Sequence, residues 1–128
     1  MNFLFDNNLP APLAEALRLL SKPVAHVRES SELGTAAPDA LILDYAVRWD
    51  YLVVTRDRAM RRTPHFQALL RSKQLGVFFV NTGAARQLVA WEIAKLVVRA
   101  WDDIERFAGG HARPFLALVQ RNGRVTKV

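Results

Sequence analysis

Residues 51–58 read Tyr-Leu-Val-Val-Thr-Arg-Asp-Arg, and the interpretation of the whole chain starts from them. The first five residues are aromatic, aliphatic or β-branched, which is typical of a strand buried on both faces. The run stops at Arg56 and Asp57, so a carboxyl group is expected at the rim of the core. The N-terminus repeats the pattern, because the apolar segment Asn2–Phe5 leads directly into Asp6. Two buried strands that each end beside an aspartate are therefore predicted.

Apolar residues recur at helical spacing between and after these strands. Helices are predicted over residues 10–20, 38–49, 64–72 and 86–107. Further strands are predicted over residues 24–27, 76–80, 115–119 and 124–128. Gly109-Gly110 is expected to end the longest helix, and Asn122-Gly123 predicts a hairpin between the last two strands. Alternating strands and helices predict an α/β fold of three layers, with a central, mainly parallel sheet and a C-terminal β-hairpin.

Length and composition narrow the class of protein. The chain has 128 residues, which predicts a single domain over residues 1–128. Its net charge of +6 favours a polyanionic partner such as nucleic acid, or an acidic protein. The sequence has no cysteine, which excludes disulfides, thiol nucleophiles and cysteine zinc sites and suits the cytoplasm. Neither a signal peptide nor a membrane-spanning run is predicted.

Three aspartates are the candidate site residues. The carboxyl ends of parallel strands share one edge of a sheet, so Asp6 and Asp57 are expected to lie near each other there. Asp39 follows Pro38 in the first turn of a predicted helix that starts from the same edge. Local roles stay open for each acid, because an aspartate often caps a helix or interacts with the dipole of its first turn.

Three carboxylates gathered in one place would need a cation. Close carboxylates repel one another and stay ionised together only when positive charge joins them. A site made only of oxygen ligands suits Mg²⁺ or Mn²⁺. Such an ion activates water and stabilises a phosphoryl group, so the three acids indicate phosphodiester hydrolysis.

Other polar and aromatic residues receive simpler interpretations. Asp44 is predicted to form an exposed pair with Arg48, four residues along the same helix. Asn81, after strand 76–80, could supply a neutral oxygen or form a turn. Trp49 falls on the apolar side of its helix and is predicted to lie in the core. For Trp91 and Trp101, packing within the chain is favoured over a dimer contact.

Three segments together resemble the PIN-like domains. They are Phe5-Asp6-Asn7-Asn8-Leu9-Pro10, Pro38-Asp39-Ala40-Leu41-Ile42 and Val53-Val54-Thr55-Arg56-Asp57-Arg58, and their order spans about residues 1–80. More narrowly, the chain is similar to small stand-alone proteins grouped with VapC-type toxins of toxin–antitoxin systems. The tail over residues 113–128 also resembles one subgroup of these toxins.

The resemblance implies a metal-dependent endoribonuclease that is inhibited by a cognate antitoxin and is often dimeric. It implies that Asp6, Asp39 and Asp57 are the catalytic and metal-binding acids. Related sequences often carry Glu where Asn7 stands and usually show a fourth acid, for which Asn81 is the nearest equivalent here.

Basic residues cluster around Asp57. Residues 56–73 hold six Lys and Arg and one acid. Arg56, Arg58, Arg61 and Arg62 are predicted to bind the phosphates of RNA. A solvated basic face is the alternative. A second basic group, Arg121, Arg124 and Lys127, lies on the predicted hairpin and could equally contact an acidic antitoxin.

The sequence leaves two other functions open. The first is a PIN-like fold without catalysis that binds a partner protein. The second is a receiver-type signalling domain, in which Asp57 and Thr82 would end the third and fourth strands. Two features disfavour the receiver domain, namely Asn7 and Asn8 in place of an acidic pair, and the absence of Lys after strand 115–119.

Overall fold

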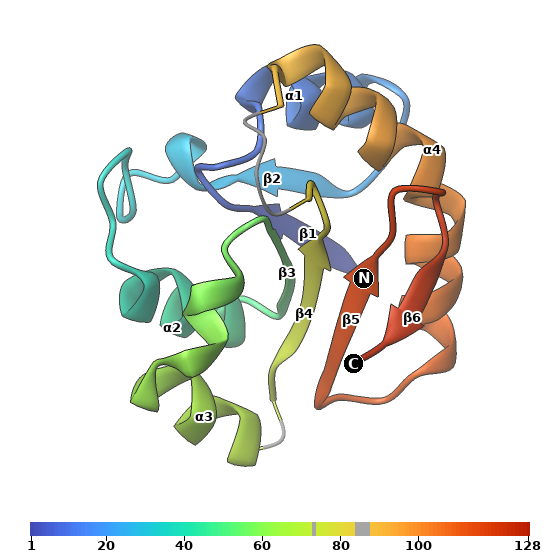
Figure 1. The fold of residues 1–128 in the computed structure, drawn as a ribbon. Helices are drawn as coiled ribbons and strands as arrows, with labels where there is room; N and C mark the ends of the chain where they lie inside the picture. Colours follow the sequence, from blue (N-terminus) through green and yellow to red (C-terminus); the bar gives the residue numbers. More distant parts are fainter. Residues whose placement is uncertain (73, 84–87) are drawn as a thin grey trace.

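The computed structural model describes residues 1–72, 74–83 and 88–128 (Figure 1). The strands are β1 (Asn2–Phe5), β2 (Val24–His26), β3 (Tyr51–Thr55), β4 (Gly76–Val80), β5 (Phe115–Val119) and β6 (Val125–Lys127). The α-helices are α1 (Ala11–Leu19), α2 (Asp39–Arg48), α3 (Pro64–Arg71) and α4 (Ala90–Gly110). Two short 3₁₀ helices follow β2 and β3, namely η1 (Val27–Glu29) and η2 (Arg58–Arg62).

The strands form one sheet in the order β2-β1-β3-β4-β5-β6. The first five strands pair in parallel, and β6 returns antiparallel along β5. The α/β fold class predicted from the sequence, with its mainly parallel sheet and C-terminal hairpin, is therefore confirmed. Because β1, β3 and β4 are neighbours, residues that follow these strands emerge side by side at one edge of the sheet.

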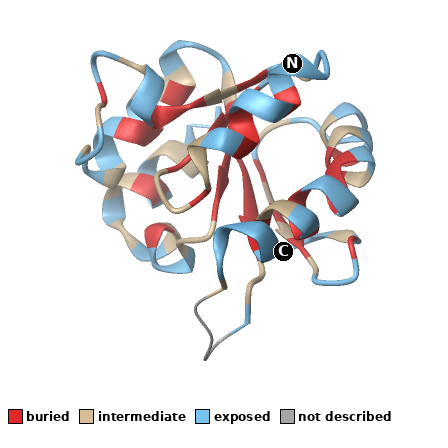
Figure 2. Cartoon of the chain, turned by 90° about the horizontal axis from the view of Figure 1, so that it is seen from above, coloured by how far each residue is buried: buried red, intermediate tan, exposed pale blue. Residues whose placement is uncertain are grey.

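Each face of the sheet carries its own core, because successive residues of a strand point to opposite faces. Phe3 and Phe5 of β1 pack in one core with residues of α1 and α4. Leu4 lies in the other core with residues of α2 and α3. In Figure 2, buried residues follow the central strands, and exposed residues gather on the outer sides of the helices. Burial on both faces explains why the strands read as continuous apolar runs.

The tryptophans divide between the interior and the surface. Trp101 of α4 is 3% exposed and meets Phe3 edge-on, with ring centroids 4.9 Å apart. Trp91 is exposed, and so is Trp49 at 53%. The prediction that Trp49 lies in the core was therefore wrong. The residue follows the last residue of α2, so the helical stripe no longer fixes where its ring points.

The longest helix also differs from its predicted limits. α4 includes Gly109 and Gly110 and ends after them, whereas the sequence suggested an end near Phe107. The predicted start at Arg86 lies outside the described residues. Among the described helices, none is long and apolar enough to cross a membrane.

Candidate metal and nucleic-acid site

Asp6 is fixed at the exit of β1 by the neighbouring strand. Its backbone N–H donates to the carbonyl of Val54, at 3.0 Å, which extends the β1–β3 ladder by one residue. Asp6 is consequently 5% exposed, and its carboxylate faces a hydrogen-bonding network instead of open water. Buried carboxylates need such partners, because an unpaired buried charge is strongly unfavourable.

The hydroxyl of Thr55 connects the two strand exits. Thr55 is fully buried at the end of β3, and its Oγ1 donates to Asp6 Oδ2 at 2.8 Å. The same oxygen accepts hydrogen bonds from the backbone N–H of Asp57 at 3.0 Å and from Asn8 Nδ2 at 3.2 Å. A hydroxyl offers one donor and two acceptor sites, so all the hydrogen-bonding capacity of Thr55 is used.

Asparagine side chains strengthen this network around Asp6. Asn8 Oδ1 accepts the backbone N–H of Arg56 at 3.0 Å, which joins the turn after β1 to the turn after β3. Asp6 Oδ1 accepts the backbone N–H of Asn7 at 2.7 Å. Asn7 Oδ1 itself is buried without a hydrogen-bond partner in the described part of the chain. The Asn7 side chain is oriented by Nδ2, which donates to the carbonyl of Thr35 at 3.1 Å. A buried amide oxygen without a partner can accept a hydrogen bond from water or bind a cation.

Asp57 begins η2 as its N-cap. Its Oδ1 accepts the backbone N–H of Ala59 at 3.0 Å, and the residue is half-buried. The local capping role considered for this acid is therefore present. A carboxylate has about four acceptor positions, so one capping bond leaves the others available.

Asp39 stands in the first turn of α2 and lies within electrostatic range of both other acids. Partial burial raises the pKa of its carboxyl group above the ordinary aspartate value. The negative charges of Asp57 and Asp6, and a hydrogen bond with the Asp57 side chain that favours the protonated form, raise this pKa further. The structure thus brings the three predicted acids into one neighbourhood, where negative charge is concentrated.

The acids do not form a closed metal cage as they stand. Over residues 1–72, 74–83 and 88–128, no three Asp, Glu or His side chains come together closely enough to hold a metal ion. The oxygens of Asp6 and Asp57 are directed toward Thr55, Asn8 and the N-terminus of η2. The donor chemistry nevertheless fits a hard divalent ion, since it comprises three carboxylates and one unpartnered amide oxygen.

Four arginines were predicted to bind phosphate, and Arg56 has a structural role as well. Its Nη1 donates to the carbonyl of Asn8 at 3.2 Å, and its Nη2 donates to Thr82 Oγ1 at 3.5 Å. Arg58, Arg61 and Arg62 follow on η2, and none of them forms an ion pair with another described residue. Lys73, the last member of the predicted basic stretch, lies outside the described residues.

Two side chains outside the acid group have different partners from those predicted. Asp44 accepts a hydrogen bond from His65 Nε2 at 2.7 Å, whereas Arg48 pairs with Glu32 at 2.6 Å. The predicted Asp44–Arg48 pair was therefore wrong, because α3 and the loop before α2 bring closer partners. Asn81 forms a turn, since its Oδ1 accepts the backbone N–H of Gly83 at 3.1 Å.

Sequence reasoning missed the network centred on Thr55 and Asn8. Both residues lie within the motifs that were quoted, but their contact depends on how β1 and β3 are aligned. The available signal is an asparagine three residues after one strand and a threonine at the end of its neighbour. That signal becomes specific only once the strands are known to be adjacent.

Comparison with known proteins gives one match. A family model described as a PIN-like domain matches residues 1–82, a range that includes Asp6, Asp39 and Asp57. No curated protein matches the chain, and no solved structure matches it.

Proposed function

Because the chain belongs to the PIN-like domain family, whose model covers residues 1–82, we propose that it is a metal-dependent endoribonuclease. One observation carries the proposal. Asp57 and Asp6 lie within electrostatic range of Asp39, and their charges, together with burial, raise the pKa of Asp39, so three acidic groups meet where two strands end and a helix begins. A divalent cation relieves such repulsion.

Asp6, Asp39 and Asp57 would hold Mg²⁺ or Mn²⁺ in this proposal. When bound, the ion supplies an activated water and stabilises the charge of a phosphoryl group. Thr55 positions Asp6 and the backbone of Asp57 through its hydroxyl. The Asn7 amide oxygen is available as a further oxygen ligand or as an acceptor for a metal-bound water.

Arginines beside the acids would hold the RNA backbone. Arg58, Arg61 and Arg62 follow Asp57 directly on η2 and form no ion pair with the described residues. Guanidinium groups bind phosphate oxygens without reading the sequence of bases. The arginines support a nucleic-acid substrate contacted chiefly through its backbone, and the choice of RNA rests on the resemblance to PIN-like ribonucleases.

The cellular role proposed for the protein is that of a toxin in a toxin–antitoxin pair. Support comes from the resemblance of its motifs and C-terminal tail to VapC-type toxins. This role would make a cognate antitoxin its protein partner, and a homodimer and cytoplasmic location are parts of the same proposal.

A PIN-like protein that binds a partner without cleaving RNA is the second candidate. It is favoured by the hydrogen bonds that already occupy oxygens of Asp6 and Asp57 and by the lack of a closed metal cage among the described residues. The receiver-domain alternative loses its basis, because the family match covers Asp57 and Thr82, the residues on which it depended.

Cleavage of a mixed RNA pool in Mg²⁺ or Mn²⁺ tests the proposal. The parent protein should cleave, and Asp57→Asn should abolish cleavage while its thermal unfolding stays cooperative. Asp44→Asn is the matched control, because it removes an exposed acid of α2 that pairs only with His65 among the described residues. Equal cleavage by the parent and Asp57→Asn would contradict the assignment, and no cleavage by the parent would favour the partner-binding alternative.

A further inference from the structure

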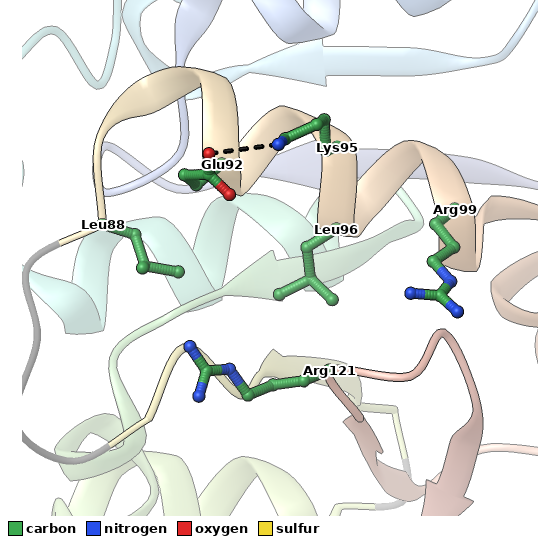
Figure 3. Close-up of a pocket in the computed structure, with 6 residues that line it drawn as sticks. All are labelled: Leu88, Glu92, Lys95, Leu96, Arg99 and Arg121. Atoms are coloured by element: carbon green, nitrogen blue, oxygen red, sulfur yellow. Dashed lines mark ion pairs between the residues drawn. The ribbon is translucent and has the colours of Figure 1, made fainter.

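A hollow of about 340 Å³ lies between α4 and the β5–β6 hairpin, and none of the three acids lines it. It is lined by Leu88, Glu92, Lys95, Leu96, Arg99 and Arg121. Figure 3 shows the leucines extending from the α4 side toward Arg121, with the guanidinium group of Arg99 beside them. All these residues follow residue 82, so they lie outside the part of the chain that matches the family model.

Positive charge dominates the hollow. Glu92 is the only acid among the described residues that line the hollow, and it is paired with Lys95 at 3.1 Å. Arg99 and Arg121 form no ion pair with any described residue. The lining therefore carries two uncompensated guanidinium groups, which are suited to phosphate recognition.

Each of the two arginines lies close to a glycine. Gly123 in the hairpin turn has a φ of 87°, and a Cβ there would stand 3.1 Å from Arg99 Cγ, so the stem of Arg99 packs against the turn. A Cβ on Gly83 would stand 3.5 Å from Arg121 Nη1, which places the Arg121 head group over the segment that follows β4. Both arginines are exposed, and each lies close to the backbone of a neighbouring turn or segment.

The hollow continues the edge of the sheet at which the acids lie. Arg121 comes two residues after β5, which runs parallel to β4 and β3. Arg56 reaches Thr82 from the exit of β3, and Arg121 covers the adjacent Gly83. Neighbouring strands are about 4.8 Å apart, so the exits of β3 and β5 are separated by about 10 Å along this edge. A few nucleotides of single-stranded RNA cover that distance.

We propose that Arg99 and Arg121 form a second phosphate-binding subsite, which holds a single-stranded RNA a few nucleotides away from the acids. The subsite rests on the proposed ribonuclease function and extends it to the path of the substrate. The guanidinium groups would bind the phosphate, and the half-buried Leu88 leaves an apolar surface beside them for a sugar. The volume is in the range of pockets that take small ligands.

The experiment measures binding of a fluorescently labelled 12-nucleotide oligouridylate by anisotropy, without divalent ions, over a series of salt concentrations. Arg99→Gln and Arg121→Gln are each expected to raise the Kd about three- to tenfold. Each should also reduce the slope of log K against log salt by about 0.7, the value for one phosphate contact on a single strand. Arg71→Gln is the matched control. Arg71 is exposed, is the last residue of α3, and forms no ion pair with the described residues.

Two results would overturn the subsite. In the first, both variants bind the oligonucleotide as tightly as Arg71→Gln does. In the second, they keep their RNA affinity but lose affinity for a labelled Asp/Glu-rich decapeptide, which would make the hollow a contact for an acidic protein. Cleavage of the same oligonucleotide in Mn²⁺ separates this proposal from the ribonuclease function. A parent that binds through the two arginines but cleaves neither this oligonucleotide nor the mixed RNA pool would leave the subsite intact and contradict the ribonuclease function.

Discussion

The Thr55 hydroxyl donates a 2.8 Å hydrogen bond to Asp6 Oδ2 from the strand next to the one that Asp6 follows. Because the same oxygen accepts the backbone N–H of Asp57, one buried side chain sets the positions of two candidate metal ligands. The placement of the acids thus depends on a neutral residue that would carry no charge in the reaction.

Thr55→Val tests this dependence. Valine keeps the shape of threonine but leaves the Asp6 carboxylate, the Asp57 N–H and the Asn8 amide each short of one partner. We expect the free energy of unfolding in urea to fall by about 1–3 kcal/mol and RNA cleavage to fall with it. Thr55→Ser should restore most of both losses because it retains the hydroxyl. Valine and serine variants of equal activity would argue against a positioning role.

Asp39→Asn should stabilise the metal-free protein at neutral pH. The folded-state pKa of Asp39 is raised, so the folded protein binds its proton more tightly than the unfolded chain does. The ordinary aspartate pKa, which applies to the unfolded chain, is about 4. As pH rises from this value through the raised folded-state pKa, the contribution of Asp39 to the free energy of unfolding falls, and above the folded-state pKa it stays unfavourable. The stability difference between Asp39→Asn and the parent should widen over this window and then level off. Urea unfolding from pH 4 to 8 measures it, and a constant difference would contradict the prediction.

Divalent ions should reverse that order of stability. Mn²⁺ is expected to raise the Tm of the parent, because binding to the folded state alone stabilises it. Asp39→Asn lacks one carboxylate and should gain less, while Asp102→Asn, which alters an exposed acid of α4, should gain as much as the parent. Thermal unfolding with and without Mn²⁺ provides the comparison. If all three proteins responded equally, Asp39 would have no part in metal binding.

Changing Arg58, Arg61 and Arg62 together to Gln should weaken RNA binding and reduce its dependence on salt. Each lost phosphate contact removes about 0.7 from the slope of log K against log salt, so the slope should fall by about 2. The control changes Arg71, Arg106 and Arg113 to Gln, which removes the same charge from segments that precede β4 and β5, at the opposite edge of the sheet. Arg106 and Arg113 lose ion pairs with Asp103 and Asp50 in this variant. The assignment fails if both triple variants bind RNA alike across the salt series.

Trp101→Ala should destabilise the protein by about 3–5 kcal/mol, whereas Trp49→Ala should change its stability little. Trp101 is 3% exposed and packs against the rings of Phe3 and Phe5. Trp49 follows the last residue of α2 and is 53% exposed. Chemical denaturation of the two variants measures the contrast. A large loss from Trp49→Ala would point to an interface that this surface forms with another molecule.

Much of the fold is predictable from local pattern, because the two faces of the sheet demand uninterrupted apolar strands. Tyr51–Thr55 and Gly76–Val80 are strands with the predicted limits for this reason. Predicted helix ends are wrong where the packing of the helix outweighs the local preference of a residue. Gly109 and Gly110 remain helical although glycine costs about 1 kcal/mol in a helix, so composition alone did not end α4.

The neighbourhood of the three acids follows from strand order, but their hydrogen bonds do not. The rule that parallel strands end at one edge leads to Asp6 and Asp57 without coordinates. The contacts of Asn8 with Thr55 and Arg56 need the alignment of β1 on β3, which depends on long-range pairing. The partner of Asp44 was mispredicted for the same reason, because His65 comes from a different helix.

The main-chain ladder between β1 and β3 has a consequence for how this protein tolerates insertions. Asp6 is tied to Val54 through the backbone, so the separation of Asp6 from Asp57 is set by the sheet and is independent of the loop over residues 30–38. Extra residues in that loop should leave the β1–β3 ladder intact, and Asp39 should keep its place because Ile42 and Leu43 anchor α2 in the core. Loop grafting at this point therefore offers a way to change the segment that contacts Asn7 while the three candidate metal ligands stay in place.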